Sequence, residues 1–271
     1  MRLTGPASRH FDPALVDAPD RRGEVAWSLF NQHYHRLQTL PWSRINEGVA
    51  LPWHRRATRL VMAWFIQRTG AILDLRRKAA LLSRFPIPRD PDVIFFGAEV
   101  GWEAALIRAL FGDGGRLVLV DCDPLAYQRF CDAPPTLTVR GPGGRPLVLR
   151  RDRAEYVRAD FFEHDEPGAF DVGLDWGLLE HFRGERKTAV LRRFGRFLRD
   201  GGVQLSAVPR DSLSTRIFYR AFGDELNFGY RELLEMPELE AALASGGFEV
   251  LARAQTPTTC VALSRPVSSA A

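Results

Sequence analysis

The stretch that decides the fold is VIFFGAEVGWEAALIRALF, residues 93–111. Its first four residues, Val93–Phe96, are apolar and predict a short buried strand. Gly97 and Gly101 follow, and a helical pattern begins at about Glu103. A glycine directly after a strand lets the backbone approach a ligand, and the N-terminus of the next helix offers free N–H groups. On spacing alone, this turn fits an ordinary strand–helix connection as well as it fits a ligand site.

Short apolar runs and helical stretches alternate along the chain after this point. The expected strands are residues 117–120, 157–160, 170–174, 203–208, 248–251 and 260–263, and the expected helices include 186–198 and 237–244. Such alternation predicts an α/β fold with a doubly wound parallel sheet, which binds ligands at the carboxyl ends of its strands. The stretch 136–151 breaks the alternation around Gly-Pro-Gly-Gly, so we expect a hairpin insertion at about residues 134–153.

The first third of the chain has a different pattern. Residues 1–23 are rich in Pro, Asp and Arg and are typical of a loose arm, whereas residues 24–85 carry helical periodicity. The segment PIPRDPD, residues 86–92, is a stiff linker because proline removes backbone donors and restricts its predecessor. We therefore predict two parts: an arm with a helical lid or cap segment over residues 1–88, and a ligand-binding domain over residues 89–271.

Composition narrows the classes of protein. The net charge is +4, but only Lys78 and Lys187 are lysines, and the arginines are scattered rather than gathered in one basic stripe, so no nucleic-acid partner is expected. The apolar run from Leu60 to Ile66 is far shorter than the ~20 residues of a membrane span. Three cysteines, none in a C-x-x-C pair, favour a reducing, cytoplasmic compartment. Nothing in the sequence fixes the oligomeric state.

Asp121 follows the second expected strand about 20 residues after the glycine turn. A carboxylate at this place can accept hydrogen bonds from both hydroxyls of a ribose. The alternative is that Asp121 or Asp123 only opens a turn or caps the next helix.

Seven segments in order resemble the class I S-adenosylmethionine-dependent methyltransferases that act on small molecules. They are VIFFGAEVGWEAALIRAL, LVLVDCDP, YVRADFFE, FDVGLDWGLLEHF, LRRFGRFLRDGGVQLSAVP, GGFEVLARA and TTCVALSRP, and the resemblance spans about residues 92–264. It implies a Rossmann-like sheet of seven strands in the order 3-2-1-4-5-7-6, with the last strand antiparallel. It also implies S-adenosylmethionine as the cofactor and a small-molecule methyl acceptor.

The resemblance assigns cofactor-binding positions to four segments. It implies that the glycine turn lies along the cofactor, that the acid after the second strand binds its ribose, that the acid after the third strand reaches its adenine amino group, and that the end of the fourth strand lines the pocket. The residues concerned are Gly97, Ala98, Glu99, Gly101, Asp121, Cys122, Asp160, Phe161, Asp175 and Trp176. For Asp175, the alternative is that it merely ends its strand and caps the next helix.

The first motif departs from the family in two places. Phe95 stands where an acid usually supports the methionine end of the cofactor, and Glu99 stands at the middle glycine. One rival interpretation is therefore a catalytically inactive, methyltransferase-like binding or scaffold protein. A second is an enzyme that binds the cofactor but performs another biosynthetic reaction. An NAD-dependent dehydrogenase is disfavoured because the glycine pattern differs and the Leu-Leu-Glu-His and Asp-Gly-Gly segments have no natural place in one.

On the acceptor side, His181 follows the fourth strand and is the candidate general base for an oxygen, nitrogen or carbon acceptor, with simple packing as the alternative. Tyr34, Tyr219 and Tyr230 are candidate substrate contacts from the helical segment and from the insertion after the fifth strand. No metal is expected. The histidines of the N-terminal segment, His33, His35 and His54, have no acidic partner nearby in sequence, and residues two apart do not share a helix face.

A substitution tests whether Glu99 replaces the missing acid. If its carboxylate pairs with the ammonium group of the cofactor, Glu99→Gln should weaken cofactor binding by well over tenfold, measured by calorimetry. Normal binding by this variant would end the hypothesis.

Overall fold

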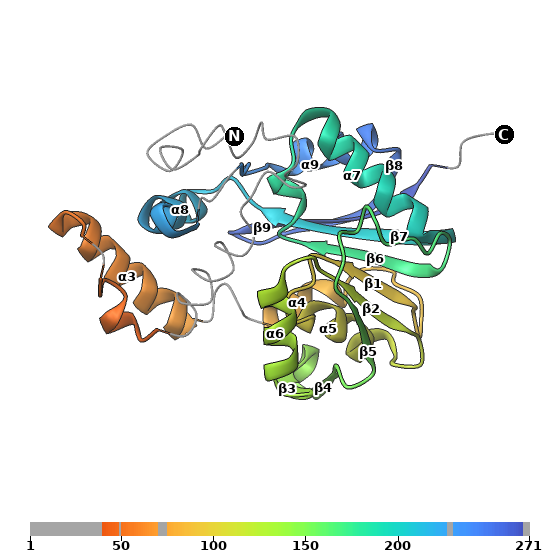
Figure 1. Cartoon of the computed structure of the whole chain (residues 1–271), viewed down its shortest axis with the longest axis horizontal. Coiled ribbons are helices and arrows are strands. Elements are labelled where there is room, and N and C mark those ends of the chain that lie inside the picture. Colours follow the sequence, from red (N-terminus) through yellow and green to blue (C-terminus); the bar gives the residue numbers. More distant parts are fainter. Residues whose placement is uncertain (1–39, 49, 70–74, 227–229, 268–271) are drawn as a thin grey trace.

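The computed structural model describes residues 40–48, 50–69, 75–226 and 230–267. Figure 1 shows a central twisted sheet covered by helices on both faces, with α3 and α8 together at one side. The main sheet consists of β1 (Val93–Phe96), β2 (Leu117–Val120), β5 (Ala154–Val157), β6 (Phe170–Trp176), β7 (Leu198–Pro209), β8 (Phe248–Gln255) and β9 (Thr259–Pro266). A separate hairpin consists of β3 (Thr136–Arg140) and β4 (Pro146–Arg150).

The α-helices are α3 (Trp53–Thr69), α4 (Leu75–Leu82), α5 (Trp102–Phe111), α6 (Pro124–Asp132), α7 (Gly184–Phe197), α8 (Leu213–Leu226) and α9 (Met236–Ser245). Short 3-10 turns are η2 (Trp42–Arg44), η3 (Pro142–Gly144) and η4 (Leu179–His181). Among the described helices, none combines the length and apolarity that crossing a membrane requires.

The order of strands in the main sheet is β5-β2-β1-β6-β7-β9-β8. With the hairpin strands left out of the numbering, this is the predicted order 3-2-1-4-5-7-6. β9 pairs antiparallel with both β7 and β8, and the pairs among β5, β2, β1, β6 and β7 are parallel. The α/β fold class, the doubly wound sheet and the antiparallel last strand are therefore confirmed.

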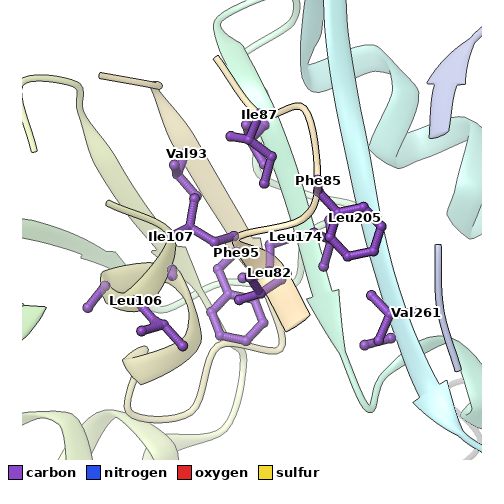
Figure 2. Close-up of a cluster of buried hydrophobic side chains, with 14 of the residues drawn as sticks. Leu82, Phe85, Ile87, Val93, Phe95, Leu106, Ile107, Leu174, Leu205 and Val261 are labelled. Carbon is purple, nitrogen blue, oxygen red and sulfur yellow. The ribbon is translucent and has the colours of Figure 1, made fainter. Parts of the chain in front are cut away.

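β1 is buried on both faces because its residues alternate between two cores. Val93 and Phe95 pack into the core under α4 and α5, whereas Ile94 and Phe96 pack into the core under α7 and α9. Figure 2 shows the first core, where Phe95 lies among side chains from α4, α5 and β6. Continuous apolar strands of this kind belong at the centre of a parallel sheet.

The first core extends beyond the expected boundary at residue 88. Leu82, Phe85 and Ile87 pack against the same side chains as Val93 and Phe95. α4 is thus part of the layer that covers the sheet, although it precedes the proline-rich linker. The division of the chain into two parts stays a prediction.

The predicted hairpin is confirmed, and its inner residues Leu137, Val139, Leu147 and Leu149 join the first core. The strand predicted for residues 157–160 is wrong in position, since β5 spans Ala154–Val157 and Asp160 lies in the turn after it. β5 is the edge strand of the sheet, and none of its four residues is fully buried. Its sequence therefore lacks the apolar run that marked the central strands.

A third, smaller core joins the helical segment to the insertion after β7. Ala63 of α3 and Ile45 pack with Phe222 and Tyr219 of α8. The buried Arg59 guanidinium lies 5.0 Å from the Phe222 ring centroid and donates hydrogen bonds to the carbonyls of Ile45 and Ala221. Helices separated by more than 100 residues of sequence are thereby held side by side (Figure 1).

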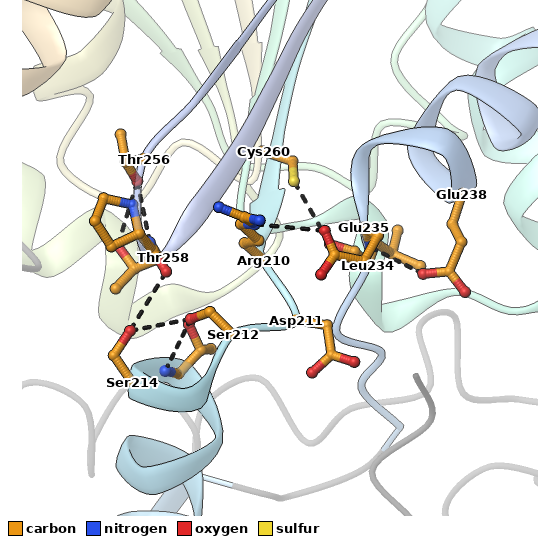
Figure 3. Close-up of polar contacts among 12 residues, drawn as sticks. Arg210, Asp211, Ser212, Ser214, Leu234, Glu235, Glu238, Thr256, Thr258 and Cys260 are labelled. Carbon is orange, nitrogen blue, oxygen red and sulfur yellow. Dashed lines mark hydrogen bonds and ion pairs between the residues drawn. The ribbon is translucent and has the colours of Figure 1, made fainter.

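The chain leaves β7 through a polar junction, drawn in Figure 3. Arg210 pairs with Glu235 at 3.4 Å, and Glu235 and Glu238 form a reciprocal capping box at the start of α9. Ser212 caps the first turn of α8 by accepting a hydrogen bond from the Thr215 N–H. The side chains of this junction therefore accept hydrogen bonds from N–H groups in the first turns of α8 and α9, which have no partners within their own helices.

Arg151 ties the hairpin to the rest of the domain from a buried position. Its guanidinium donates to the carbonyls of Val100, Phe130 and Ala133, among others, and lies 4.6 Å from the Trp102 ring centroid. Val100 belongs to the turn after β1, so this one side chain connects the hairpin, the end of α6 and that turn.

Removing this guanidinium should destabilise the fold strongly. Arg151→Met leaves several buried carbonyls without donors, and we expect a loss of about 3 kcal/mol in the free energy of unfolding. Arg151→Lys should recover less than half of that loss because an ammonium lacks the planar fork. Urea unfolding measures both, and the exposed neighbour Arg150→Met should change stability by less than about 0.5 kcal/mol. Equal losses for the two methionine variants would contradict this account.

Candidate functional site

The turn between β1 and α5 has an unusual backbone. Gly97, Glu99 and Gly101 have φ values of +64°, +46° and +84°. A Cβ at Gly101 would lie 2.5 Å from Leu119 Cδ1, so the Leu119 side chain would have to shift, and the left-handed backbone of Gly101 also favours glycine. Glu99 also has a left-handed backbone, but unlike glycine it carries a side chain, so this conformation costs a strain energy of order 1 kcal/mol.

Hydrogen bonds fix this turn to the end of β2. The Gly97 and Ala98 N–H groups donate to the carbonyl of Val120 at 2.9 and 3.3 Å. The Glu99 N–H donates to Asp121 Oδ2 at 3.0 Å. The turn and the acid that sequence reasoning singled out are therefore in direct contact.

The Asp121 carboxylate is held from two sides. Its Oδ1 accepts a hydrogen bond of 2.9 Å from the Asp123 N–H, opposite the bond from Glu99. Burial raises the pKa of Asp121 to about 6, against these two hydrogen bonds, which lower it. Asp123 caps α6 by accepting a hydrogen bond from the Leu125 N–H at 3.1 Å, so capping falls to Asp123 rather than Asp121.

The Glu99 side chain pairs with a residue that sequence reasoning missed. Its Oε1 accepts a hydrogen bond of 2.7 Å from the guanidinium of Arg129 on α6. Burial raises the pKa of Glu99, and the charge of Arg129 opposes that rise. The acid at the middle glycine position is therefore neutralised within the chain, which the ammonium-pairing hypothesis did not anticipate.

A second ion pair lies at the same edge of the sheet. The Lys78 ammonium of α4 donates to Glu103 Oε1 in the first turn of α5 and lies 4.6 Å from the ring centroid of Trp176. The charges of Lys78 and Glu103 both act on Glu99. Sequence reasoning missed this pair too, because only the packing of α4 against α5 brings it together.

The turn after β5 is where the resemblance places the adenine of the cofactor. Asp160 Oδ1 accepts a hydrogen bond of 2.8 Å from the Phe162 N–H. Phe161 packs into an aromatic group with Phe96 and Phe194, at centroid distances of 6.0 and 5.4 Å. Burial, followed by the charges of Asp121 and Asp160, raises the pKa of the Cys122 thiol to about 12, so this cysteine is protonated at neutral pH.

Asp175 is fully buried near the carboxyl end of β6. Its Oδ2 accepts hydrogen bonds from Gln204 Nε2 at 2.9 Å and Ser206 Oγ at 2.5 Å, both on β7. Burial raises its pKa to about 7, while these hydrogen bonds lower it. Trp176 follows on the other face, under Lys78.

His181 is enclosed in a buried polar cluster. Its Nδ1 lies 2.9 Å from the carbonyl oxygen of Tyr230, and its Nε2 lies 3.1 Å from the Arg231 guanidinium. Because a carbonyl accepts and a guanidinium donates, the ring is neutral with its proton on Nδ1. Burial, followed by the charge of Arg231, lowers the pKa of His181 well below its usual value.

The three candidate substrate tyrosines have different outcomes. Tyr219 is buried on α8 under Arg231, with 4.5 Å between the guanidinium carbon and the ring centroid. Tyr230 is buried beside His181 and contributes its carbonyl to that ring. Tyr34 lies outside the described residues, as do His33 and His35. Among the described residues, no three His, Cys, Asp or Glu side chains are grouped as a metal site requires.

Glu180 completes this cluster. Its carboxylate is buried, and its Oε1 lies 3.7 Å from His181 Nε2. Burial raises its pKa to about 7, and the charge of Arg231 opposes that rise. The end of β6 and the segment after it thus hold two acids, Asp175 and Glu180, whose pKa values lie near neutrality.

Comparison with known proteins supports the fold. The chain matches no family model and no curated protein sequence. Among solved structures, it resembles the Burkholderia thailandensis 1,6-didemethyltoxoflavin-N1-methyltransferase bound to its substrate and S-adenosylhomocysteine, at 19% identity, covering 81% of this chain and 92% of that one, with a TM-score of 0.50.

Two further solved structures extend this similarity. DhpI in complex with SAH has 14% identity, covers 90% of this chain and 98% of its own, and has a TM-score of 0.54. Human N-acetylserotonin methyltransferase in complex with SAM has 13% identity, covers 89% of this chain and 67% of its own, and has a TM-score of 0.54. The chain therefore has the fold of class I S-adenosylmethionine-dependent methyltransferases, and the predicted resemblance to them is confirmed at the level of the fold.

The raised pKa of Asp175 gives a stability test. An unfolded Asp titrates near pH 4 and the folded one near 7, so the folded state holds the extra proton between these values and loses stability as the pH rises through them. Asp175→Asn keeps a neutral side chain throughout. Its stability relative to the wild type should rise by roughly 2 kcal/mol from pH 5 to pH 8, measured by urea unfolding.

The exposed Asp132→Asn, at the end of α6, is the matched control and should show no such trend. A constant difference between Asp175→Asn and the wild type across this pH range would mean that the Asp175 carboxyl titrates as an ordinary surface acid.

Proposed function

We propose that this protein is an S-adenosylmethionine-dependent methyltransferase acting on an oxygen, nitrogen or carbon centre of a small molecule. The observation that carries the proposal is the position of the Asp121 carboxylate at the carboxyl end of β2, where it accepts hydrogen bonds from the Glu99 and Asp123 N–H groups. Each carboxylate oxygen retains a lone pair for a ligand hydroxyl. The similar structures bound to S-adenosylmethionine or its demethylated product support the same cofactor.

The residues at this edge fit the cofactor at its nucleoside end. Asp121 can accept hydrogen bonds from the ribose hydroxyls. The resemblance to the family assigns the adenine amino group to Asp160, in the turn after the edge strand. Gly97 and Gly101 keep the turn close to the strand ends by adopting left-handed backbone conformations, which residues with a side chain adopt only with strain. At the amino-acid end, the buried Phe95 offers no polar atom, so charges must come from elsewhere.

The cofactor, when bound, supplies an electrophilic methyl group on a sulfonium. The chain then has to align an acceptor with it and exclude water, which requires little covalent chemistry from the protein. The contacts of His181 oppose its proposed role as the base. Protonation of Nε2 would place a second cation 3.1 Å from Arg231, so the ring serves better as a fixed neutral hydrogen-bonding group.

An acceptor that needs no strong base fits these surroundings. Tyr219 lies against Arg231 and Tyr230 lies beside His181, so the buried polar cluster after β6 has aromatic neighbours. Soft or already activated centres, such as a ring nitrogen, a phenolate or an enolic carbon, react with a sulfonium by alignment alone. The inactive scaffold remains the rival, and it differs in binding no cofactor.

Calorimetric titration tests the proposal. The purified protein, stripped of cofactor, should bind S-adenosylmethionine and S-adenosylhomocysteine with micromolar affinity and should not bind NAD. Asp121→Ala should weaken binding of both by at least tenfold because it removes the ribose acceptor. Asp132→Ala, an exposed acid on α6, should leave both affinities within twofold.

Absence of heat up to millimolar ligand would overturn the proposal and favour the scaffold. Cofactor binding without methyl transfer to any member of a broad panel of phenols, amines and enols would instead favour the non-methylating enzyme.

A further inference from the structure

The ion pair of Lys78 and Glu103 joins α4 to α5 at the carboxyl edge of the sheet. Its side chains are 13% and 20% exposed, so it is shielded but reachable from solvent. Lys78 comes from α4 and Glu103 from the first turn of α5, two residues after Gly101. The pair thus adjoins the glycine turn of the proposed cofactor site.

This pair lies near Phe95, where the first motif differs from that of the family. Phe95 packs on the same face of the sheet as Trp176, whose ring lies under the Lys78 ammonium. Where the resemblance expects an acid on β1, the chain has a phenyl ring buried in the core. In the part of the chain that the structure describes, α4 and α5 cover this face and present the polar side chains of Lys78 and Glu103.

The chemistry of the pair matches a zwitterion. The amino-acid end of S-adenosylmethionine carries an ammonium and a carboxylate on one carbon, and it needs an anion and a cation side by side. An ammonium has three donors and a carboxylate about four acceptor sites, so one mutual hydrogen bond leaves both groups with capacity for a ligand. Partial burial strengthens such charge-assisted bonds.

We propose that Glu103 and Lys78 receive the amino-acid end of the cofactor, Glu103 binding its ammonium and Lys78 its carboxylate. This inference rests on the proposed function and deepens it, because it replaces the acid that is missing at Phe95. Trp176 fixes the Lys78 ammonium over its ring and so orients it before the ligand arrives.

Glu99 is the competing acid for the ammonium. Its Oε1 already accepts a hydrogen bond from Arg129, and that guanidinium is buried beside it. Drawing Glu99 toward a ligand ammonium would weaken its ion pair with Arg129, whose side chain is only 9% exposed, and would disturb the strained turn that carries Glu99. Glu99 therefore acts in shaping the turn, and Glu103 in binding.

A series of ligands tests this on the wild-type protein. S-adenosylhomocysteine has the complete amino-acid end, decarboxylated S-adenosylmethionine keeps only the ammonium, and 5′-methylthioadenosine has neither group. By calorimetry, S-adenosylhomocysteine should bind at least tenfold more tightly than 5′-methylthioadenosine. Equal affinity for these two would overturn the inference while leaving the proposed function intact.

Variants then assign the two charges. Glu103→Gln should weaken binding of S-adenosylhomocysteine and of decarboxylated S-adenosylmethionine by at least tenfold. Lys78→Met should weaken only S-adenosylhomocysteine to that extent. Both variants should bind 5′-methylthioadenosine within twofold of the wild type, whereas a merely structural role would change all ligands alike.

Two comparison variants complete the test. Glu240→Gln removes a glutamate of α9 that pairs with Arg253 at 2.6 Å, far along the chain from the glycine turn, and should change no affinity. Glu99→Gln should weaken S-adenosylhomocysteine less than Glu103→Gln does. A larger effect of Glu99→Gln would return the ammonium to Glu99 and overturn the assignment, and a wild-type protein that binds none of the ligands would refute the proposed function itself.

Discussion

The burial of β1 on both faces is the constraint on which the rest of the molecule depends. Its four residues divide between two cores, so helices must cover both sides of the sheet. Parallel neighbours on both edges of the strand then bring the ends of β2 and β6 to the same level as Phe96. The turn that follows has no freedom to move away, and this is why the Glu99 N–H meets the Asp121 carboxylate.

The charges around this turn are balanced within the chain. Arg129 neutralises Glu99, and Lys78 neutralises Glu103, so four charged groups at the edge sum to zero when ionised. A balanced arrangement costs less to bury than a single carboxylate would. The ion pair with Arg129 also helps to offset the strain of the left-handed backbone at Glu99, because it stabilises the position of the Glu99 side chain.

The fold could be predicted from the sequence because the central strands are continuous apolar runs. Leu117–Val120 and Val93–Phe96 were placed to the residue, whereas the edge strand Ala154–Val157 was misplaced because one side of it faces no neighbour and its sequence is mixed. The contact between the glycine turn and Asp121 could also be anticipated, since the carboxyl ends of adjacent parallel strands lie together.

The partners of the charged residues could not be predicted in this way. Lys78 and Glu103 are 25 residues apart, and Arg129 and Glu99 are 30 apart, with a strand or helix between them in each case. Their pairing depends on how α4, α5 and α6 pack on the sheet, which periodicity does not specify. For His181, the sequence suggested a titrating base, but the arginine that keeps it neutral lies 50 residues away.

The two sides of the carboxyl edge therefore differ in electrostatic character. Around the glycine turn, Glu99 and Glu103 are paired with Arg129 and Lys78, and backbone N–H groups hold the Asp121 carboxylate. At the end of β6 and just after it, burial shifts the pKa values of Asp175, Glu180 and His181 toward their neutral forms. Methyl transfer converts a cationic sulfonium into a neutral thioether, so the sulfur loses its positive charge while the charge of the acceptor rises by one. In the enzyme that we propose, neutral acids at this place add no anion that would hold the sulfonium in its ground state, which transfer requires in addition to binding.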